Sequence, residues 1–492
     1  MDKNDSIPDK FPSSTESLGI SSSDNNVNSS VRPKLSWNLL NSRRFIVTIL
    51  GMFGFMNVYA LRASLSVAIV AMTAKRNHIL ENGTVIQIQE FTWNSEQQGI
   101  VLSSFFWGYI CTQILGGLLA TKYGGNTVFG IGIAASSVFM IVSPWAAKQG
   151  LFYLVAIRIL IGLFEGVTYP GIQEVYANWA PRYERTAISS IVHTGSQLGI
   201  FVSFLLSGIF ADNFGWESIF YVFGGFGVVW YALWIYFVKR NPASDPRISL
   251  EEKNYIESNL DSSGVHRIPW ISIITSKAMI ALLVTNMSET LSFYIFLTQT
   301  PTYLNDVLKS DLGTTGIISA APYLIYMLVA AGVGVSSDYL RSRNILTTQQ
   351  VRKTMIASGF LICAVLILVM VNLDDPVGIC ACLILTISLN ALTKITYLCN
   401  PLDFAPDYSS VVMGISNTFG GISGLVAPLM AGYIVKTGTQ DEWKTVFYTA
   451  VGFCVLGTVA FTAFGQGSIQ SWAKINSQQR QMTSEVFEIT QT

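Results

Sequence analysis

The 492-residue sequence has few charged side chains and very few histidines. Lys, Arg, Asp and Glu make up only 12% of it, it contains three histidines, and 30 basic residues balance 30 acidic ones. A chain without net charge has no overall field that would attract nucleic acid, so we expect no nucleic-acid partner. The six cysteines fall within apolar runs, which argues against a disulfide framework and against a metal site.

The polar segments also lack the motifs of catalysis. They contain no Gly-rich phosphate loop, no nucleophile triad and no cluster of metal ligands. We therefore expect a protein that is not an enzyme and that has no cofactor.

Apolar residues are abundant instead, and they fall in long runs. Half of the chain is hydrophobic, and a bilayer core of about 30 Å requires roughly 20 apolar residues of helix per crossing. Twelve such runs begin near Phe45, Gly99, Thr127, Phe152, Ala187, Ile219, Ala278, Thr314, Thr354, Val377, Ser409 and Val446. The sequence thus predicts an all-α, multi-pass integral membrane protein whose lipid bilayer is its solvent.

A polar stretch divides the twelve spans into two sets of six. We predict a disordered tail at 1–44, a six-helix half at 45–240, a central loop at 241–277, a second six-helix half at 278–465 and a tail at 466–492. The similar segments GGLLATKYGG (116–125) and GVGVSSDYLR (332–341) occupy matching places in the two halves. Repeated halves are typical of transporters that hold their substrate between them.

The distribution of Lys and Arg among the loops predicts the orientation. Basic residues such as Arg43, Arg44, Lys239 and Arg240 gather on the side of the termini, which places both termini and the central loop in the cytoplasm. Asn82, in an Asn-Gly-Thr triplet on the opposite side, is then a candidate glycosylation site. Neither tail carries a convincing sorting signal, so the plasma membrane and an endolysosomal or vesicular membrane both remain open.

Five charged residues lie deep within the predicted spans. They are Arg62 in span one, Arg158 and Glu165 in span four, Glu289 in span seven and Lys394 in span ten. A charge at this depth costs several kcal/mol unless it has a partner, a water-filled cavity or a function. In proteins built from two six-helix halves, these four spans are equivalent and line a central cavity. Each residue fits either a structural ion pair or a contact with a ligand.

The types of these charges favour anion transport. A guanidinium can hold a carboxylate or phosphate with two parallel hydrogen bonds, and we expect Arg62 and Arg158 to attract the anion. Arg158 and Glu165 are two helical turns apart, about 10 Å along the axis, so they share a face and act separately. Glu165 is our candidate for exchanging a proton or sensing a coupling cation, and Glu289 and Lys394 for a pair across the cavity.

Six longer runs carry a family pattern, and they follow one another along nearly the whole chain outside the tails. The runs are SFFWGYICTQILGG (104–117), RILIGLFEGVTYP (158–170), NWAPRYERTA (178–187), GWESIFYVFGGFGVVWYALW (215–234), LDFAPDYSSVVMGISNTFGGISG (402–424) and EWKTVFY (442–448). Together they resemble the anion and cation symporters that include sialin, the vesicular glutamate transporters and the type I sodium-phosphate cotransporters. The resemblance implies a major facilitator fold with alternating access, and transport of anions driven by protons, sodium or membrane potential.

The resemblance also carries over individual residues. Arg62, Arg158 and Glu165 match the family's motifs, and Tyr109, Tyr169 and Tyr294 match aromatic positions that line its cavity. Helix packing is the competing explanation for any one of the tyrosines.

Several positions depart from the family pattern. Family members commonly have a histidine where Pro401 and Gln173 stand, and the glutamate transporters have one at the position of Leu102. Those transporters also place an arginine in the slot of Glu289, which reverses the local charge and argues against glutamate as the substrate.

We therefore expect a symporter of organic acids or phosphate, coupled to H⁺ or Na⁺, with no obligate protein partner. The alternative is a transporter-like sensor or interaction protein that has lost coupling together with the family histidines.

Overall fold

The computed structural model describes residues 42–79, 85–181, 184–260 and 268–473. Within these ranges, 12 helical spans are long and apolar enough to cross a membrane. The N-terminal half contains α1 (Arg43–Thr73), α2 (Ser95–Tyr123), α3 (Gly125–Gln149), α4 (Leu151–Gly166), α5 (Thr168–Trp179), α6 (Arg185–Phe214) and α7 (Glu217–Phe237). The C-terminal half contains α10 (Lys277–Leu308), α11 (Leu312–Ser342), α12 (Thr348–Met370), α13 (Pro376–Leu389), α14 (Ala391–Phe404), α15 (Ser409–Ile434) and α16 (Gln440–Phe464). The predicted arrangement of two six-span halves is confirmed, and Asn82 lies outside the described residues.

Polar capping turns explain why the helices begin slightly before the apolar runs that predicted them. Asn94 accepts a hydrogen bond from the Gln97 amide, and the Gln97 side chain accepts one from the Asn94 amide, which closes the first turn of α2. Thr439 caps α16 in the same reciprocal way with Glu442. Such boxes satisfy amides that have no partner within the helix. A hydropathy window detects the helix only after these polar turns.

The fourth and tenth spans are each divided into two helices. α4 and α5 meet at Val167, and α13 and α14 meet at Asn390. Pro170 explains the first break, because it has no amide hydrogen to donate to the Gly166 carbonyl four residues earlier. No proline lies at the second break. The two divided spans occupy equivalent positions in the two halves, and both carry deep charges.

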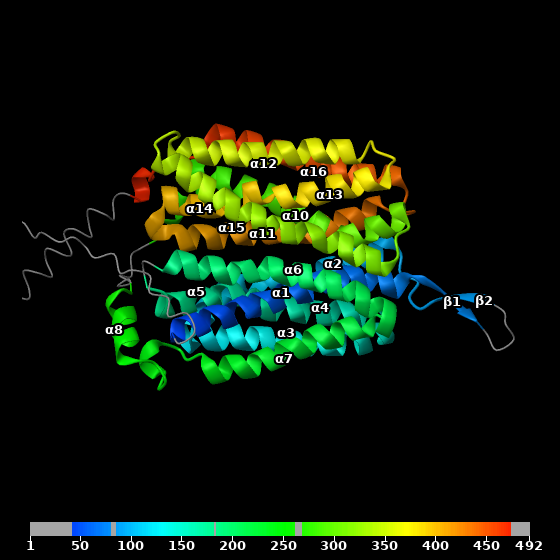
Figure 1. Cartoon of the computed structure of the whole chain (residues 1–492), viewed down its shortest axis with the longest axis horizontal. Coiled ribbons are helices and arrows are strands. Elements are labelled where there is room, and N and C mark those ends of the chain that lie inside the picture. The colour runs from blue at the N-terminus through cyan, green and yellow to red at the C-terminus, as the bar shows by residue number, and fades with distance from the viewer. Residues whose placement is uncertain (1–41, 80–84, 182–183, 261–267, 474–492) are drawn as a thin grey trace, which may run out of the picture. The chain divides into compact units, whose positions relative to one another are not determined.

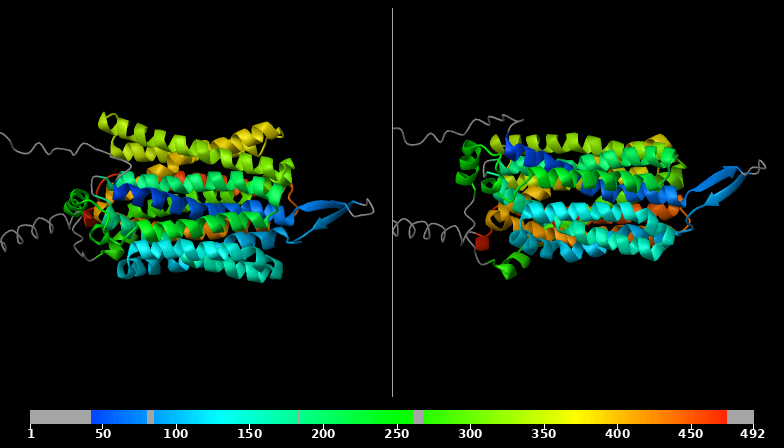
Figure 2. Two further views of the ribbon diagram at one scale, coloured as in Figure 1. Left: turned by 60° about the horizontal axis from the view of Figure 1, so that its bottom comes forward. Right: turned by 90° about the horizontal axis from the view of Figure 1, so that it is seen from below.

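The short elements lie outside the spans. In the central loop these are a 3₁₀ turn η1 (Pro242–Ser244), α8 (Leu250–Ser258) and α9 (Trp270–Ile274), and a second 3₁₀ turn, η2 (Pro406–Tyr408), precedes α15. Between α1 and α2 the chain forms an antiparallel hairpin of β1 (Lys75–Ile79) and β2 (Val85–Gln89). The all-α prediction did not include these strands. We call this side of the helices, visible in Figures 1 and 2, the hairpin end.

The two halves pack against each other through α2 with α15 and through α6 with α11 (Figure 1). Glycines allow the closest approaches. A Cβ atom on Gly99 would lie 2.7 Å from the Pro428 carbonyl oxygen, and one on Gly208 would lie 2.7 Å from the Leu312 carbonyl oxygen. Small residues of this kind let membrane helices approach backbone to backbone. The two contacts hold the halves together at the hairpin end.

Candidate functional site

The structure gathers the five deep charges into two groups, one in each half. Arg62, Arg158 and Glu165 lie together in the N-terminal half, and Glu289 and Lys394 lie together in the C-terminal half. In both groups the first span of the half meets the divided fourth span. Spans one and four of the N-terminal half are thus joined by an ion pair, and so are the equivalent spans seven and ten of the C-terminal half.

Arg62 on α1 forms a buried ion pair with Glu165 on α4. Arg62 Nε donates a hydrogen bond of 2.7 Å to Glu165 Oε2. The guanidinium also lies over the rings of Tyr59, Phe105 and Tyr109, at 4.9, 4.8 and 4.7 Å from their centroids. Aromatic faces attract a cation that has been removed from water. Arg62 is therefore held by one carboxylate and three rings.

The same arginine connects the two halves. Its Nη1 lies 3.5 Å from the Tyr294 hydroxyl on α10, at the long limit of a hydrogen bond. The Tyr294 ring also packs edge-on against Phe106 of α2, with 4.6 Å between the centroids. Tyr294 thus brings a polar group of the C-terminal half to the N-terminal charges.

Arg158 lies beside this pair without a hydrogen-bonding partner for two of its nitrogens. Its exposed fraction is 2%, and among the described residues neither Nε nor Nη1 has a hydrogen-bond partner. Its guanidinium lies 5.4 Å from the Phe105 ring centroid, on the ring that Arg62 also contacts. Two guanidinium groups and one carboxylate leave this group with one excess positive charge. A buried unsatisfied cation is costly, so its presence indicates a negatively charged partner.

A small cavity adjoins these charges. The charged cavity, as we name it, has a volume of about 10 Å³, which is the room that one water molecule needs. Its lining consists of Arg62, Leu102, Phe105, Phe106, Arg158, Tyr294, Leu297 and Thr298. An organic anion is much larger than a water molecule, so the helices must separate before one can enter.

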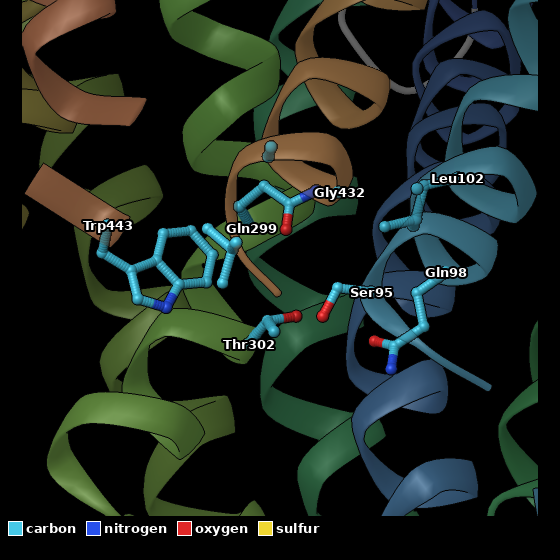
Figure 3. Close-up of a pocket in the computed structure, with 10 residues that line it drawn as sticks. Ser95, Gln98, Leu102, Gln299, Thr302, Gly432 and Trp443 are labelled. Atoms are coloured by element: carbon cyan, nitrogen blue, oxygen red, sulfur yellow. The ribbon is translucent and has the colours of Figure 1, made fainter. Parts of the chain in front are cut away.

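A second small cavity lies on the hairpin side between α2, α10, α15 and α16. We name it the polar cavity, because Ser95, Gln98, Gln299 and Thr302 contribute polar side chains to its lining together with the indole of Trp443 (Figure 3). Leu102 lines both cavities. The Leu102 side chain is therefore an apolar element between the charged residues and a polar region towards the hairpin end.

The C-terminal group is centred on an ion pair between Glu289 of α10 and Lys394 of α14. Lys394 Nζ lies 2.8 Å from Glu289 Oε2. Tyr397 directs its hydroxyl towards the same carboxylate oxygen at 3.3 Å and towards Asn286 Oδ1 at 3.0 Å. One carboxylate and one ammonium leave this group neutral, in contrast to the N-terminal group.

The three predicted tyrosines have different surroundings. Tyr109 stacks on the Arg62 guanidinium and Tyr294 lines the charged cavity. The Tyr169 hydroxyl instead lies 2.8 Å from the Tyr59 hydroxyl, so Tyr169 reaches Arg62 only through Tyr59. Among the described residues, no group of three His, Cys, Asp or Glu side chains is placed to hold a metal ion.

Four residues of these groups escaped the sequence analysis. Tyr59 precedes Arg62 by three positions, Asn286 precedes Glu289 by three, and Tyr397 follows Lys394 by three. Phe105 precedes Tyr109 by four. Residues three or four apart share a helix face. A search for polar or aromatic residues one turn away from each deep charge would have identified Tyr59, Asn286 and Tyr397, and the same search around Tyr109 would have identified Phe105.

Comparisons with known proteins bear on this architecture. Residues 44–428 match the Major Facilitator Superfamily. Sialin of Homo sapiens is 37% identical over 451 residues, which cover 88% of this chain and 91% of sialin. Vesicular glutamate transporter 1 of Xenopus tropicalis is 37% identical over 440 residues, covering 88% of this chain and 76% of the transporter. Vesicular glutamate transporter 2 of Homo sapiens is 36% identical over 440 residues, covering 88% and 75%.

Solved structures show the same fold at low sequence identity. A bacterial homologue of the human lysosomal transporter Spinster, in an inward-facing and occupied conformation, has a TM-score of 0.66 and 11% identity. The match covers 85% of this chain and 96% of that one. The nucleoside transporter NupG has a TM-score of 0.61 and 13% identity, with 86% and 98% covered.

Proposed function

Because the chain belongs to the major facilitator superfamily, and within it to the family of sialin and the vesicular glutamate transporters, we propose that this membrane transporter carries small anions coupled to a cation. The substrate class is an organic acid or phosphate. Transport by alternating access requires a site that both halves can reach, and Tyr294 of α10 lies at the charges of the N-terminal half.

The observation that carries this proposal is the unsatisfied Arg158 guanidinium. Arg62 has Glu165 as its counter-charge and lacks a hydrogen-bond partner at Nη2 alone, whereas Arg158 is buried with two nitrogens that have no such partner among the described residues. A carboxylate or phosphate beside Arg158 would accept hydrogen bonds from the guanidinium and would balance the excess positive charge. We assign Arg158 as the primary anion contact and Arg62 as the secondary one.

The ion pair of Arg62 and Glu165 supplies a route for coupling. A proton that reaches Glu165 would neutralise the carboxylate and leave Arg62 without its counter-charge, which would increase the attraction for an anion. Proton and anion would then bind better together than separately, which is the requirement for symport. Hard metal cations prefer several oxygen ligands, and Glu165 contributes one carboxylate that already contacts Arg62. We therefore favour a proton over sodium at this position.

The excess charge also bears on the substrate. One positive charge is balanced by an anion with a single negative charge, such as a monocarboxylate or monovalent phosphate. The vesicular glutamate transporters are named for glutamate, an acidic amino acid. Glu289 in the C-terminal half argues against a second carboxylate on the substrate near α10.

The test is uptake into proteoliposomes that contain the purified protein. A panel of radiolabelled monocarboxylates, acidic sugars, acidic amino acids and phosphate is offered with proton, sodium and voltage gradients imposed separately. We expect saturable uptake of at least one anion, accelerated by an inward proton gradient and reduced strongly in Arg158→Ala. Absence of flux for every anion, or undiminished affinity in Arg158→Ala, would refute the assignment.

A further inference from the structure

The ammonium of Lys394 lies against a carboxylate and two aromatic rings in the C-terminal half. It lies 2.8 Å from Glu289 Oε2 and over two aromatic rings, 5.3 Å from the centroid of Phe293 and 5.5 Å from that of Tyr397. A carboxylate combined with aromatic faces is an environment that binds cations. Neither Glu289 nor Lys394 lines the charged cavity of the N-terminal half.

Neighbouring polar groups hold the carboxylate side of this position in place. Asn286 Nδ2 donates to the Ser416 carbonyl oxygen at 2.8 Å and lies 2.7 Å from the Ser416 hydroxyl. The amide is thereby oriented with Oδ1 towards the hydroxyls of Tyr397 and Thr290, at 3.0 and 2.9 Å. The Asn286 amide and the hydroxyls of Tyr397 and Thr290 near the Glu289 carboxylate are thus preorganised by contacts between α10, α14 and α15.

Glu289 has unused capacity for a cation. Its side chain is 1% exposed, and its second oxygen, Oε1, has no hydrogen-bond partner among the described residues. A single Lys ammonium satisfies only Oε2. A buried carboxylate with a free oxygen attracts a cation strongly in a medium of low dielectric constant.

The location of Lys394 on its helix gives no other reason for a positive charge. Lys394 lies in the first turn of α14, directly after the break at Asn390. The N-terminus of a helix carries a partial positive charge, so a cation is disfavoured there. The lysine is therefore stabilised by Glu289 and the two rings, and not by its own helix.

We propose that Glu289, Asn286, Tyr397 and Thr290 form a monovalent-cation site, and that Lys394 fills it from within the chain as a tethered cation. The C-terminal half then carries a permanent counter-charge and takes up no exchangeable cation. This inference rests on the proposed function, which it deepens by confining cation coupling to Glu165 in the N-terminal half. The Lys394 side chain is 23% exposed, so a small cation can reach the site once the lysine is shortened.

The first test measures thermal unfolding of purified Lys394→Ala in detergent without any transport substrate. Methylammonium is the probe, in a buffer whose other cation is the bulky N-methylglucamine, and sodium and tetramethylammonium are compared with it. A ligand that binds only the folded protein raises the melting temperature in a saturable manner. We expect such a rise with methylammonium in Lys394→Ala and none in the wild type.

Two variants serve as matched controls. Glu289→Gln/Lys394→Ala has the same space but no carboxylate, and Lys394→Met fills the space of the lysine stem without its charge. Neither should respond to methylammonium. An equal response in the double variant, or no response of Lys394→Ala to any of the three cations, would overturn the proposal. If Lys394→Ala folds poorly, the folded yield should recover when it is extracted in methylammonium, and equal yields with and without it would also overturn the proposal.

The second test measures uptake in proteoliposomes. Lys394→Ala should transport at least about tenfold more slowly than wild type, as expected when a buried carboxylate loses its partner, and methylammonium should restore most of the rate. If methylammonium fails to restore uptake by Lys394→Ala while the wild type transports normally, the tethered-cation proposal is contradicted and the proposed function is not. Absence of wild-type anion uptake contradicts the proposed function instead, and the melting experiment remains decisive for the site.

Discussion

Arg62 Nε lies 2.7 Å from Glu165 Oε2, in a buried ion pair that joins the first span of the N-terminal half to the divided fourth span. Glu289 and Lys394 join the corresponding spans of the C-terminal half at 2.8 Å, with the order of charges reversed. The two halves therefore share the position of a buried pair, while among the described residues the group of deep charges in the N-terminal half includes a further arginine, Arg158. That asymmetry makes the N-terminal half the attractive one for an anion.

Replacement of Glu165 by Gln is expected to separate transport from its driving force. The amide cannot exchange a proton and leaves Arg62 without a counter-charge, so anion uptake should lose its acceleration by an imposed proton gradient while anion affinity is maintained or improved. The measurement is the initial uptake rate with and without the gradient. Glu174→Gln on α5 is the control, because Glu174 contacts only Asn178 on its own helix among the hydrogen bonds described, and it should behave as wild type.

Replacement of Arg158 is expected to weaken anion binding. A hydrogen bond to a charged group contributes about 1.5–3 kcal/mol, so Arg158→Ala should raise the apparent KM by about ten- to a hundredfold. Arg158→Lys retains the charge but not the planar pair of donors, so its KM should lie between that of the wild type and that of Arg158→Ala. Arg247→Ala, a change at an exposed arginine of the central loop, controls for loss of a positive charge. Unchanged KM values in both Arg158 variants would contradict the assignment.

Leu102 is expected to act as a barrier between the charged cavity and the polar cavity. Leu102→Ala shortens the only residue common to the two described linings, so preloaded anion should leak from proteoliposomes when no proton, sodium or voltage gradient is imposed. Because Leu102 is buried, the substitution should also lower the free energy of unfolding by about 2–5 kcal/mol. Leu118→Ala on the same helix provides the comparison, because Leu118 is 65% exposed and should affect neither leak nor melting temperature. Equal leak rates in both variants would exclude a barrier role for Leu102.

Larger residues in place of the glycines at the hairpin end are expected to destabilise the contact between the two halves. A leucine at Gly99 must displace the Pro428 backbone, and overpacking of this kind costs about 1–3 kcal/mol. Gly99→Leu should therefore lower both the melting temperature and the maximal transport rate, because the halves cannot close at this end. A Cβ atom added at Gly117 on the same helix has no neighbouring atom within 4 Å, so Gly117→Leu should retain both properties. Identical behaviour of the two variants would show that this contact is unimportant.

The sequence predicted the twelve spans and the depth of the five charges, because both depend on local properties. A run of apolar residues such as 354–370 is a helix in lipid whatever surrounds it, since the backbone must satisfy its own hydrogen bonds there. The hairpin between α1 and α2 and the breaks at Val167 and Asn390 were missed. The hairpin lies in a short polar loop whose pairing has no strong local signal, and no proline marks the break at Asn390.

The pairing of the charges was decided by the tertiary structure. The sequence placed Arg158 and Glu165 on one face of span four, about 10 Å apart along the axis, and could not show which of them would meet Arg62. Packing of α1 against the N-terminal half brings Arg62 to Glu165 and leaves Arg158 unsatisfied. Similarly, only the approach of α2 to α10 places Leu102 between two cavities. The sequence itself determined that these residues lie in the membrane, because each of them falls within an apolar run long enough to cross it. The contacts between helices far apart in the chain determined their partners, because such contacts depend on geometry that no single span contains.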